Sequence, residues 1–161
     1  KQALALMVTT KRRPQLYYGT EVLMNGTKEV ADGDVRKDFL GGFPGDSRNT
    51  FTKEGRSVEE NEMFDWLSRL LHWRQSNEVI SKGTMIQFLP HDGVYVFARQ
   101  KDGKTVLTIL NGTSKKVSLD MNRYAEVIND AASAVDVTTG KNISLKGNLI
   151  LEPRASMVLD Y

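Results

Sequence analysis

Residues 94–110 read VYVFARQKDGKTVLTIL, and this stretch decides the fold. Two runs rich in β-branched and aromatic residues, 94–99 and 105–110, flank the pair Asp102-Gly103. Asp-Gly favours a two-residue hairpin loop because both residues tolerate positive φ. The stretch therefore predicts two neighbouring antiparallel strands.

The same β-rich texture extends on both sides of this hairpin. Further runs lie at 85–89, 116–119, 125–128, 135–138, 149–151 and 156–160, and turn pairs such as Asp92-Gly93 and Lys146-Gly147 separate several of them. Short strands at this spacing favour an antiparallel sandwich. We therefore expect a mainly β chain whose residues 81–161 form a C-terminal β-sandwich domain, with the boundary near Ser81-Lys82-Gly83.

A long amphipathic helix is predicted at 58–77. Ser57-Val58-Glu59-Glu60 has the pattern of a capping box, in which the Ser hydroxyl and the Glu side chain satisfy each other's backbone N–H groups. Met63, Leu67 and Leu70 then recur at helical spacing and form one apolar stripe.

The first nineteen residues have the pattern of an α/β unit. Residues 1–10 are rich in helix formers and are expected to end a helix. Pro14 disfavours helix at the residue before it, and residues 15–19, QLYYG, predict a short buried strand. This order is typical of an α/β barrel or a doubly wound sheet. The loop at 20–56 is too long for a simple connector, so it is either functional or disordered.

Composition excludes several classes of protein. The chain has no cysteine, so disulfides, thiolate nucleophiles and Cys-based zinc sites are excluded. The net charge of +2 gives no reason to expect nucleic acid or an anionic membrane as partner. No apolar run approaches the ~20 residues of a membrane-spanning helix. Without an initiator Met or a signal-peptide pattern, the chain is expected to begin inside a larger protein.

Motifs for other chemistries are weak. His72 and His91 have no neighbouring nucleophile pattern of a hydrolytic triad. Residues 41–45 and 140–142 do not match phosphate-binding loops. Residues 32–34 begin like a calcium loop but lack its later ligands. We expect neither a metal nor a cofactor.

Asp32 and Arg36 are the candidate site residues. An acid and a guanidinium four residues apart could pair with each other, or could clamp a sugar by accepting from and donating to its hydroxyls. Spacing alone favours the salt bridge and leaves the sugar contact open. The nearby aromatic residues at 17, 18, 39, 43 and 51 are expected in the core.

Residues 9–24, TTKRRPQLYYGTEVLM, resemble the α-amylase superfamily around its eighth barrel strand. The shared pattern is a small or charged pair, then Pro, an apolar strand, Tyr-Tyr-Gly, an acid two residues on and an apolar pair. Residues 32–39 and 41–46 resemble the neopullulanase and cyclomaltodextrinase branch used in bacterial starch breakdown. The resemblance covers essentially the whole chain.

The resemblance implies a (β/α)₈ barrel followed by a C-terminal β-sandwich. Residues 1–80 would then be the end of the catalytic barrel, with 15–19 as its eighth strand and 58–77 as its eighth helix. The loop at 20–56 would lie at the face that carries the active site, and Asp32 and Arg36 would contact a glucose of the substrate.

The activity implied for the intact enzyme is retaining hydrolysis of α-glucosidic bonds in starch, pullulan or cyclodextrins. Its catalytic carboxylates would all precede residue 1, so no catalytic residue is named and the chain alone is expected to be inactive. The implied partners are α-glucan oligosaccharides and the remainder of the barrel, with the bacterial periplasm favoured over the cytoplasm.

Two other functions stay open for the sandwich: a non-catalytic starch-binding domain, and a structural domain that shields the barrel. Tyr95 and Phe97 alternate along a predicted strand. We expect them in the core rather than as an exposed starch-binding pair.

Overall fold

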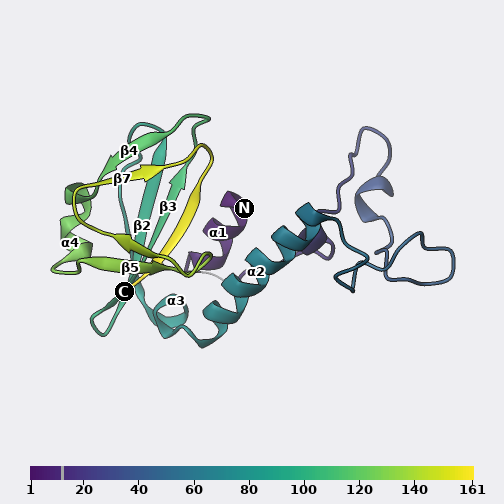
Figure 1. Ribbon diagram of the computed structural model, residues 1–161, viewed down its shortest axis with the longest axis horizontal. Helices are drawn as coiled ribbons and strands as arrows, with labels where there is room; N and C mark the ends of the chain where they lie inside the picture. The colour runs from purple at the N-terminus through teal and green to yellow at the C-terminus, as the bar shows by residue number, and fades with distance from the viewer. Residues whose placement is uncertain (12) are drawn as a thin grey trace. The chain divides into compact units, whose positions relative to one another are not determined.

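The computed structural model describes residues 1–11 and 13–161 and contains two compact units (Figure 1). The first joins Lys1–Pro14 to Arg69–Tyr161, and the second is Gln15–Ser68. The domain division between residues 80 and 81 stays a prediction.

The first unit is built on antiparallel sheets, which confirms the mainly β prediction. The larger sheet has six strands in the order β1-β2-β3-β8-β5-β6, and β4 pairs with β7 in a second sheet. The strands are β1 Thr84–Gln87, β2 Val94–Lys101, β3 Lys104–Asn111, β4 Val117–Asp120, β5 Ser133–Asp136, β6 Asn142–Ser144, β7 Asn148–Leu151 and β8 Ser156–Asp160.

The central hairpin forms as the sequence predicts. Lys101 pairs with Lys104, which leaves Asp102 and Gly103 as the two-residue loop. Both have positive φ, 50° and 78°. These values suit the tight turn whose twist matches that of the flanking strands.

The two central strands are buried on both faces. Val96 of β2 and Ile109 of β3 belong to the sandwich core, together with Leu119 of β4 and Leu151 of β7. Because side chains alternate along a strand, the neighbouring residue Phe97 faces the other side, where it is also fully buried. The outer face of the large sheet therefore needs a cover.

Helices supply this cover. Helix α1, Gln2–Thr9, packs on β3 and β8, and α3, Glu78–Lys82, packs on β2 and β3. Ala5 and Val8 of α1 are completely buried. At the start of α1, Nε2 of Gln2 donates to the carbonyl oxygens of Asn111, at 2.6 Å, and Ala155, at 3.1 Å.

The predicted long helix is confirmed as α2, Val58–Ser76, which continues from the second unit into the first. Its capping box is present. Ser57 Oγ accepts from the N–H of Glu60 at 3.2 Å, and the Ser57 N–H donates to Glu60 Oε2 at 2.7 Å. No helix in the described ranges 1–11 and 13–161 is long and apolar enough to cross a membrane.

The strand predicted at residues 15–19 is wrong for this structure. Residues 13–17 have no regular structure, Tyr18 and Gly19 form a turn, and the 3₁₀ turn Thr20–Val22 follows. An extended segment becomes a strand only when its backbone groups pair with a neighbour. Every strand formed by the described residues belongs to one of the two antiparallel sheets.

A second correction concerns residues 125–128, predicted as a β-rich run. They form the short helix α4, Ala125–Ile128, directly after the 3₁₀ turn Met121–Tyr124. Asp120 starts this helical segment, since its carboxylate accepts from the N–H of Asn122 at 3.0 Å. A four-residue apolar run is too short for periodicity to distinguish helix from strand.

Candidate functional site

Asp34 organises the first part of the loop at 20–56. One of its carboxylate oxygens accepts from the N–H of Thr27 at 2.7 Å, and the other pairs with Nζ of Lys37 at 2.8 Å. The hydrogen bond from Lys37, and next the one from Thr27, lower the pKa of Asp34. Gly26 fits here because a Cβ would lie 2.1 Å from the Asp34 carbonyl oxygen.

Asp32 and Arg36, the predicted site residues, lie on either side of Asp34 and are both exposed. The turn that separates them is closed by the Arg36 N–H, which donates to the Gly33 carbonyl at 3.0 Å. Within the described residues, no hydrogen bond or ion pair links the two side chains. The mutual salt bridge that spacing favoured is therefore not formed, and the sugar contact stays a prediction.

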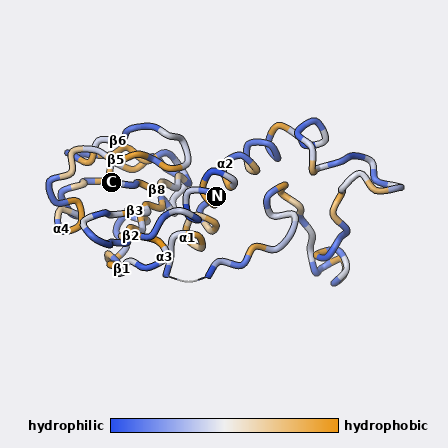
Figure 2. Tube along the Cα trace, turned by 90° about the horizontal axis from the view of Figure 1, so that it is seen from below, coloured by the Kyte–Doolittle hydropathy of each residue, from blue (hydrophilic) through white to orange (hydrophobic). Residues whose placement is uncertain are grey.

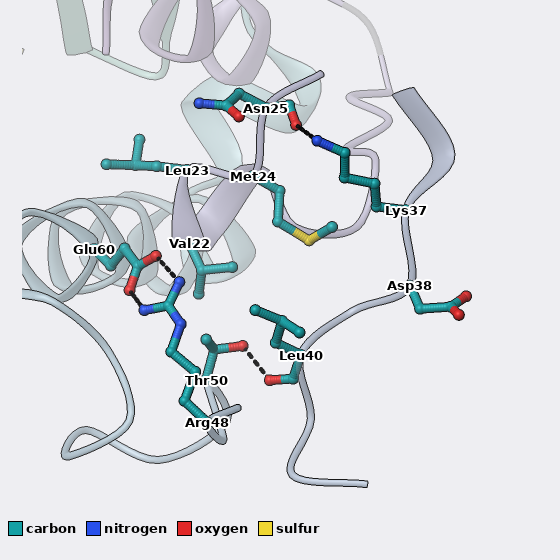
Figure 3. Close-up of a pocket in the computed structure, with 10 residues that line it drawn as sticks. All are labelled: Val22, Leu23, Met24, Asn25, Lys37, Asp38, Leu40, Arg48, Thr50 and Glu60. Atoms are coloured by element: carbon teal, nitrogen blue, oxygen red, sulfur yellow. Dashed lines mark hydrogen bonds and ion pairs between the residues drawn. The ribbon is translucent and has the colours of Figure 1, made fainter. Parts of the chain in front are cut away.

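A hollow of about 350 Å³ lies beside this segment in the same unit (Figure 3). Its polar lining includes Asn25, Lys37, Asp38, Arg48 and Glu60, whereas Asp32 and Arg36 do not line it. Apolar side chains complete the wall, namely Val22, Leu23, Met24 and Leu40.

A bidentate ion pair between Arg48 and Glu60 lines one side of the hollow. The two terminal nitrogens of Arg48 donate to the two carboxylate oxygens of Glu60 at 2.6 and 2.7 Å (Figure 3). The bond from Arg48 lowers the pKa of Glu60, and Glu60 in turn raises the pKa of Arg48. A general acid needs a raised pKa in order to stay protonated, whereas the pKa of Glu60 is lowered. Glu60 is therefore suited to hold the loop in place and not to donate a proton in catalysis.

Sequence reasoning found Glu60 only as a capping residue and missed its partner. Arg48 lies twelve positions earlier in a segment without periodicity, so no local signal connects the two. Asn25, Lys37 and Asp38 were missed for the same reason, because only the folded loop brings them to one hollow.

The aromatic residues of this unit differ from expectation. Tyr17, Phe43 and Phe51 are 56%, 62% and 65% exposed, so the prediction that they lie in the core is wrong for this structure. Phe51 stacks against Phe39 with ring centroids 4.7 Å apart. Rings held in solvent offer apolar faces to a ligand or to another protein segment.

The arrangement therefore suits binding. It offers amide and charged groups beside apolar side chains, the usual composition of a small-molecule site. Among the described residues, no group of three or more His, Asp or Glu side chains could hold a metal ion.

The family match and the sequence relatives of this chain agree with one another. Residues 85–160 match the family described as the cyclo-malto-dextrinase C-terminal domain. The chain is 26% identical over 160 residues to the cyclomaltodextrinase of Thermoanaerobacter pseudethanolicus, covering 99% of this chain and 24% of that protein. It is 29% identical over 154 residues to the cyclomaltodextrin glucanotransferase of Bacillus licheniformis, covering 89% of this chain and 19% of that protein.

Solved structures show the same fold. An Anoxybacillus α-amylase superposes with a TM-score of 0.71 at 20% identity, covering 99% of this chain and 31% of that one. The α-amylase of Geobacillus thermoleovorans, solved with acarbose, superposes with a TM-score of 0.70 at 22% identity. This superposition covers 99% of this chain and 32% of the Geobacillus chain. These comparisons confirm the resemblance to the C-terminal portion of α-amylase-family enzymes. The chain spans about a quarter or less of the length of these two curated relatives.

Proposed function

We propose that this chain is the non-catalytic C-terminal part of an amylolytic enzyme of the α-amylase family. The intact enzyme hydrolyses α-glucosidic bonds with retention at the anomeric carbon. Residues 1–80 contribute the last part of its (β/α)₈ barrel, and the enzyme acts on starch, pullulan or cyclodextrins as a neopullulanase-like hydrolase.

The observation that carries this proposal is the match of residues 85–160 to the cyclo-malto-dextrinase C-terminal domain. The alignment with the Thermoanaerobacter relative extends it to 99% of the chain, so the segment before the sandwich is included. The hollow in the second unit supports a contact role, since the Glu60 carboxylate is occupied by Arg48 and has a lowered pKa.

The test compares the full-length protein with the 161-residue chain on β-cyclodextrin, pullulan and soluble starch. We expect reducing sugar from the full-length protein, with the α-anomer appearing first by NMR, and none from the chain alone. Hydrolysis by the chain alone, or none by the full-length protein on all three substrates, would refute the proposal.

Asp32 and Arg36 are proposed to contact a glucose of the bound α-glucan. Both are exposed, and no protein hydrogen bond among the described residues engages either side chain, so their donors and acceptors stay available. In the full-length enzyme, Asp32→Ala with Arg36→Ala should change the product lengths obtained from maltohexaose.

The matched control is Lys28→Ala with Glu29→Ala, a neighbouring exposed pair of opposite charge. It should leave the product profile unchanged. If both double variants give the wild-type profile, Asp32 and Arg36 lie outside the binding site.

For the sandwich itself, a structural role is favoured over starch binding. Every aromatic side chain in residues 84–161 is buried or half-buried, so this segment has no exposed aromatic platform. The sheet instead holds helix α2, because Asp160 of β8 accepts from Trp73 Nε1 at 2.6 Å. Migration in starch gels tests this directly: retardation of residues 81–161 would favour a starch-binding function.

A further inference from the structure

The tripeptide Asn-Gly-Thr occurs at residues 25–27 and again at 111–113, in very different surroundings. The first copy lies in the loop of the second unit, and the second begins at the last residue of β3 in the first unit. An asparagine followed by glycine is chemically labile, because glycine has no side chain to shield its nitrogen from the asparagine Cγ. Since the two tripeptides are identical, a difference in their reactivity comes chiefly from the fold.

The second copy is closed to this reaction. Asn111 is completely buried. Its Nδ2 donates to two backbone carbonyl oxygens at 2.8 Å each, and its Oδ1 accepts from the N–H and the hydroxyl of Thr113 at 3.0 and 2.8 Å. The nitrogen that would attack is also engaged, because the Gly112 N–H donates to the Gly93 carbonyl at 2.8 Å. Reaction at Asn111 therefore requires local unfolding.

The first copy is open. Asn25 and Gly26 are both exposed, and no hydrogen bond among the described residues engages the Asn25 side chain or the Gly26 N–H. Nζ of Lys37 contacts the backbone carbonyl of Asn25 at 3.4 Å, and the side-chain amide lies apart from it (Figure 3). Figure 2 shows that hydrophilic residues make up most of the surrounding loop, in keeping with its exposure to water.

We propose that Asn25 is a site of spontaneous deamidation and isoaspartate formation, from which the fold protects Asn111. The Gly26 nitrogen loses its proton to solvent base and attacks Cγ of Asn25. The new C–N bond closes a five-membered imide while the bond from Cγ to Nδ2 breaks, and the leaving nitrogen takes up a proton and departs as ammonia. Water then opens the imide at either carbonyl and gives aspartate or isoaspartate. The reaction consumes one water, releases one ammonia and transfers no electrons.

Both products change the charge of the hollow that Asn25 lines. The charged side chains of that lining are Lys37, Asp38, Arg48 and Glu60, two positive and two negative. Aspartate or isoaspartate at position 25 adds one carboxylate, so the lining acquires a net negative charge.

Isoaspartate also lengthens the backbone by one methylene directly before Gly26. The chain is tightly packed at this point, since a Cβ on Gly26 would lie 2.1 Å from the Asp34 carbonyl oxygen. We therefore expect the Thr27 N–H to lose its 2.7 Å hydrogen bond to the Asp34 carboxylate in the isoaspartate form.

The experiment is prolonged incubation of the 161-residue chain in mildly alkaline buffer, followed by peptide mapping with mass spectrometry. We expect the peptide that contains Asn25 to gain the mass that replacement of an amide NH₂ by OH produces, and to separate into two isomers on chromatography. Asn25 should convert at least about tenfold faster than Asn111, because the buried site must first open. In urea the two sites should convert at similar rates, because their tripeptides are identical.

Asn25→Gln keeps an exposed amide but lengthens the side chain by one methylene, so the imide would need a six-membered ring. The gain in mass at this peptide should therefore be lost. The matched control is Asn142→Gln, at an exposed asparagine followed by the bulky Ile143, and it should leave conversion at Asn25 unchanged. Circular dichroism checks that both variants keep the fold.

The proposal is overturned if Asn25 does not convert in the folded chain, if Asn111 converts as fast as Asn25 there, or if the gain in mass persists in Asn25→Gln. None of these results depends on hydrolysis by the full-length protein, so this proposal and the proposed function fail separately.

Discussion

Arg99 of β2 is completely buried, and its guanidinium is satisfied by backbone alone in the described structure. It donates to the carbonyl oxygens of Gly83 at 2.8 Å, Thr9 at 3.2 Å and Thr84 at 3.4 Å. Burial, and next the charge of Arg74, lower its pKa. Arg74 donates to the adjacent Val8 carbonyl, so two guanidiniums meet the negative end of helix α1.

Replacing Arg99 by Met should therefore be costly. The substitution leaves buried carbonyl groups without donors, so we expect the free energy of unfolding to fall by about 3 kcal/mol. Urea denaturation followed by tryptophan fluorescence measures this. Arg99→Lys should recover part of the loss, whereas Arg123→Met, which removes an exposed arginine with one carbonyl contact, should cost below about 0.5 kcal/mol. Equal losses for Arg99→Met and Arg123→Met would contradict this role.

The ion pair of Arg48 and Glu60 gives a prediction about pH. Because Arg48 lowers the pKa of Glu60 in the folded state, the pair contributes stability above the ordinary Glu pKa and loses it as the pH falls through the lowered value. The stability difference between wild type and Glu60→Gln should therefore shrink as the pH decreases from 7 to about 3.

Carboxyl NMR titration of Glu60 tests the cause. Arg48→Met should move the titration midpoint of Glu60 upward, and Lys53→Met in the same loop should not. A midpoint that does not change in Arg48→Met would show that Arg48 is not the cause.

The elements differ in how far local sequence determines them. The hairpin of β2 and β3 and the capped helix α2 were predictable because their signals lie within a few residues: a turn pair, a capping box and an apolar stripe. The segment at 15–19 has equally clear local signals but forms no strand, since pairing requires a neighbour. The sequence singled out only Asp32 and Arg36, which do not line the hollow and whose sugar contact stays a prediction. The residues around the hollow could not be predicted, because they come together only when the loop folds.

The central hairpin turn can be tested at Gly103. It has a φ of 78°, and an added Cβ would meet no atom within 4 Å, so Gly103→Ala changes backbone strain without a clash. We expect a loss of about 1–2 kcal/mol in the free energy of unfolding. Gly103→Asn should lose less, because Asn tolerates this conformation, and Lys104→Ala in the same hairpin should be close to neutral. A fully tolerated Gly103→Ala would mean that the turn relaxes to another type.

For the whole molecule, the important feature is a sheet that is buried on both faces. Phe97, Val106 and Val158 are fully buried although they face away from the sandwich core, because α1 and α3 cover them. Arg99 also depends on a carbonyl of α1. Residues 81–161 therefore contain the core of the sandwich without the whole of its cover.

We expect residues 81–161 alone to be less stable than the full 161-residue chain and to bind the dye ANS through the uncovered face. Thermal unfolding by circular dichroism and ANS fluorescence compare the two. The same melting temperature for both, without ANS binding, would instead support a domain that begins at residue 81 and folds by itself.

Strand β8 follows the other seven strands of the described residues in sequence, yet it pairs with β3 on one side and β5 on the other. The hairpin partners β1 to β3 and the pair β5 and β6 are therefore separate ribbons until residues 156–160 arrive between them. During synthesis, these two ribbons cannot join into one sheet before residues 156–160 have left the ribosome. A deletion of residues 156–160 would split the large sheet in two.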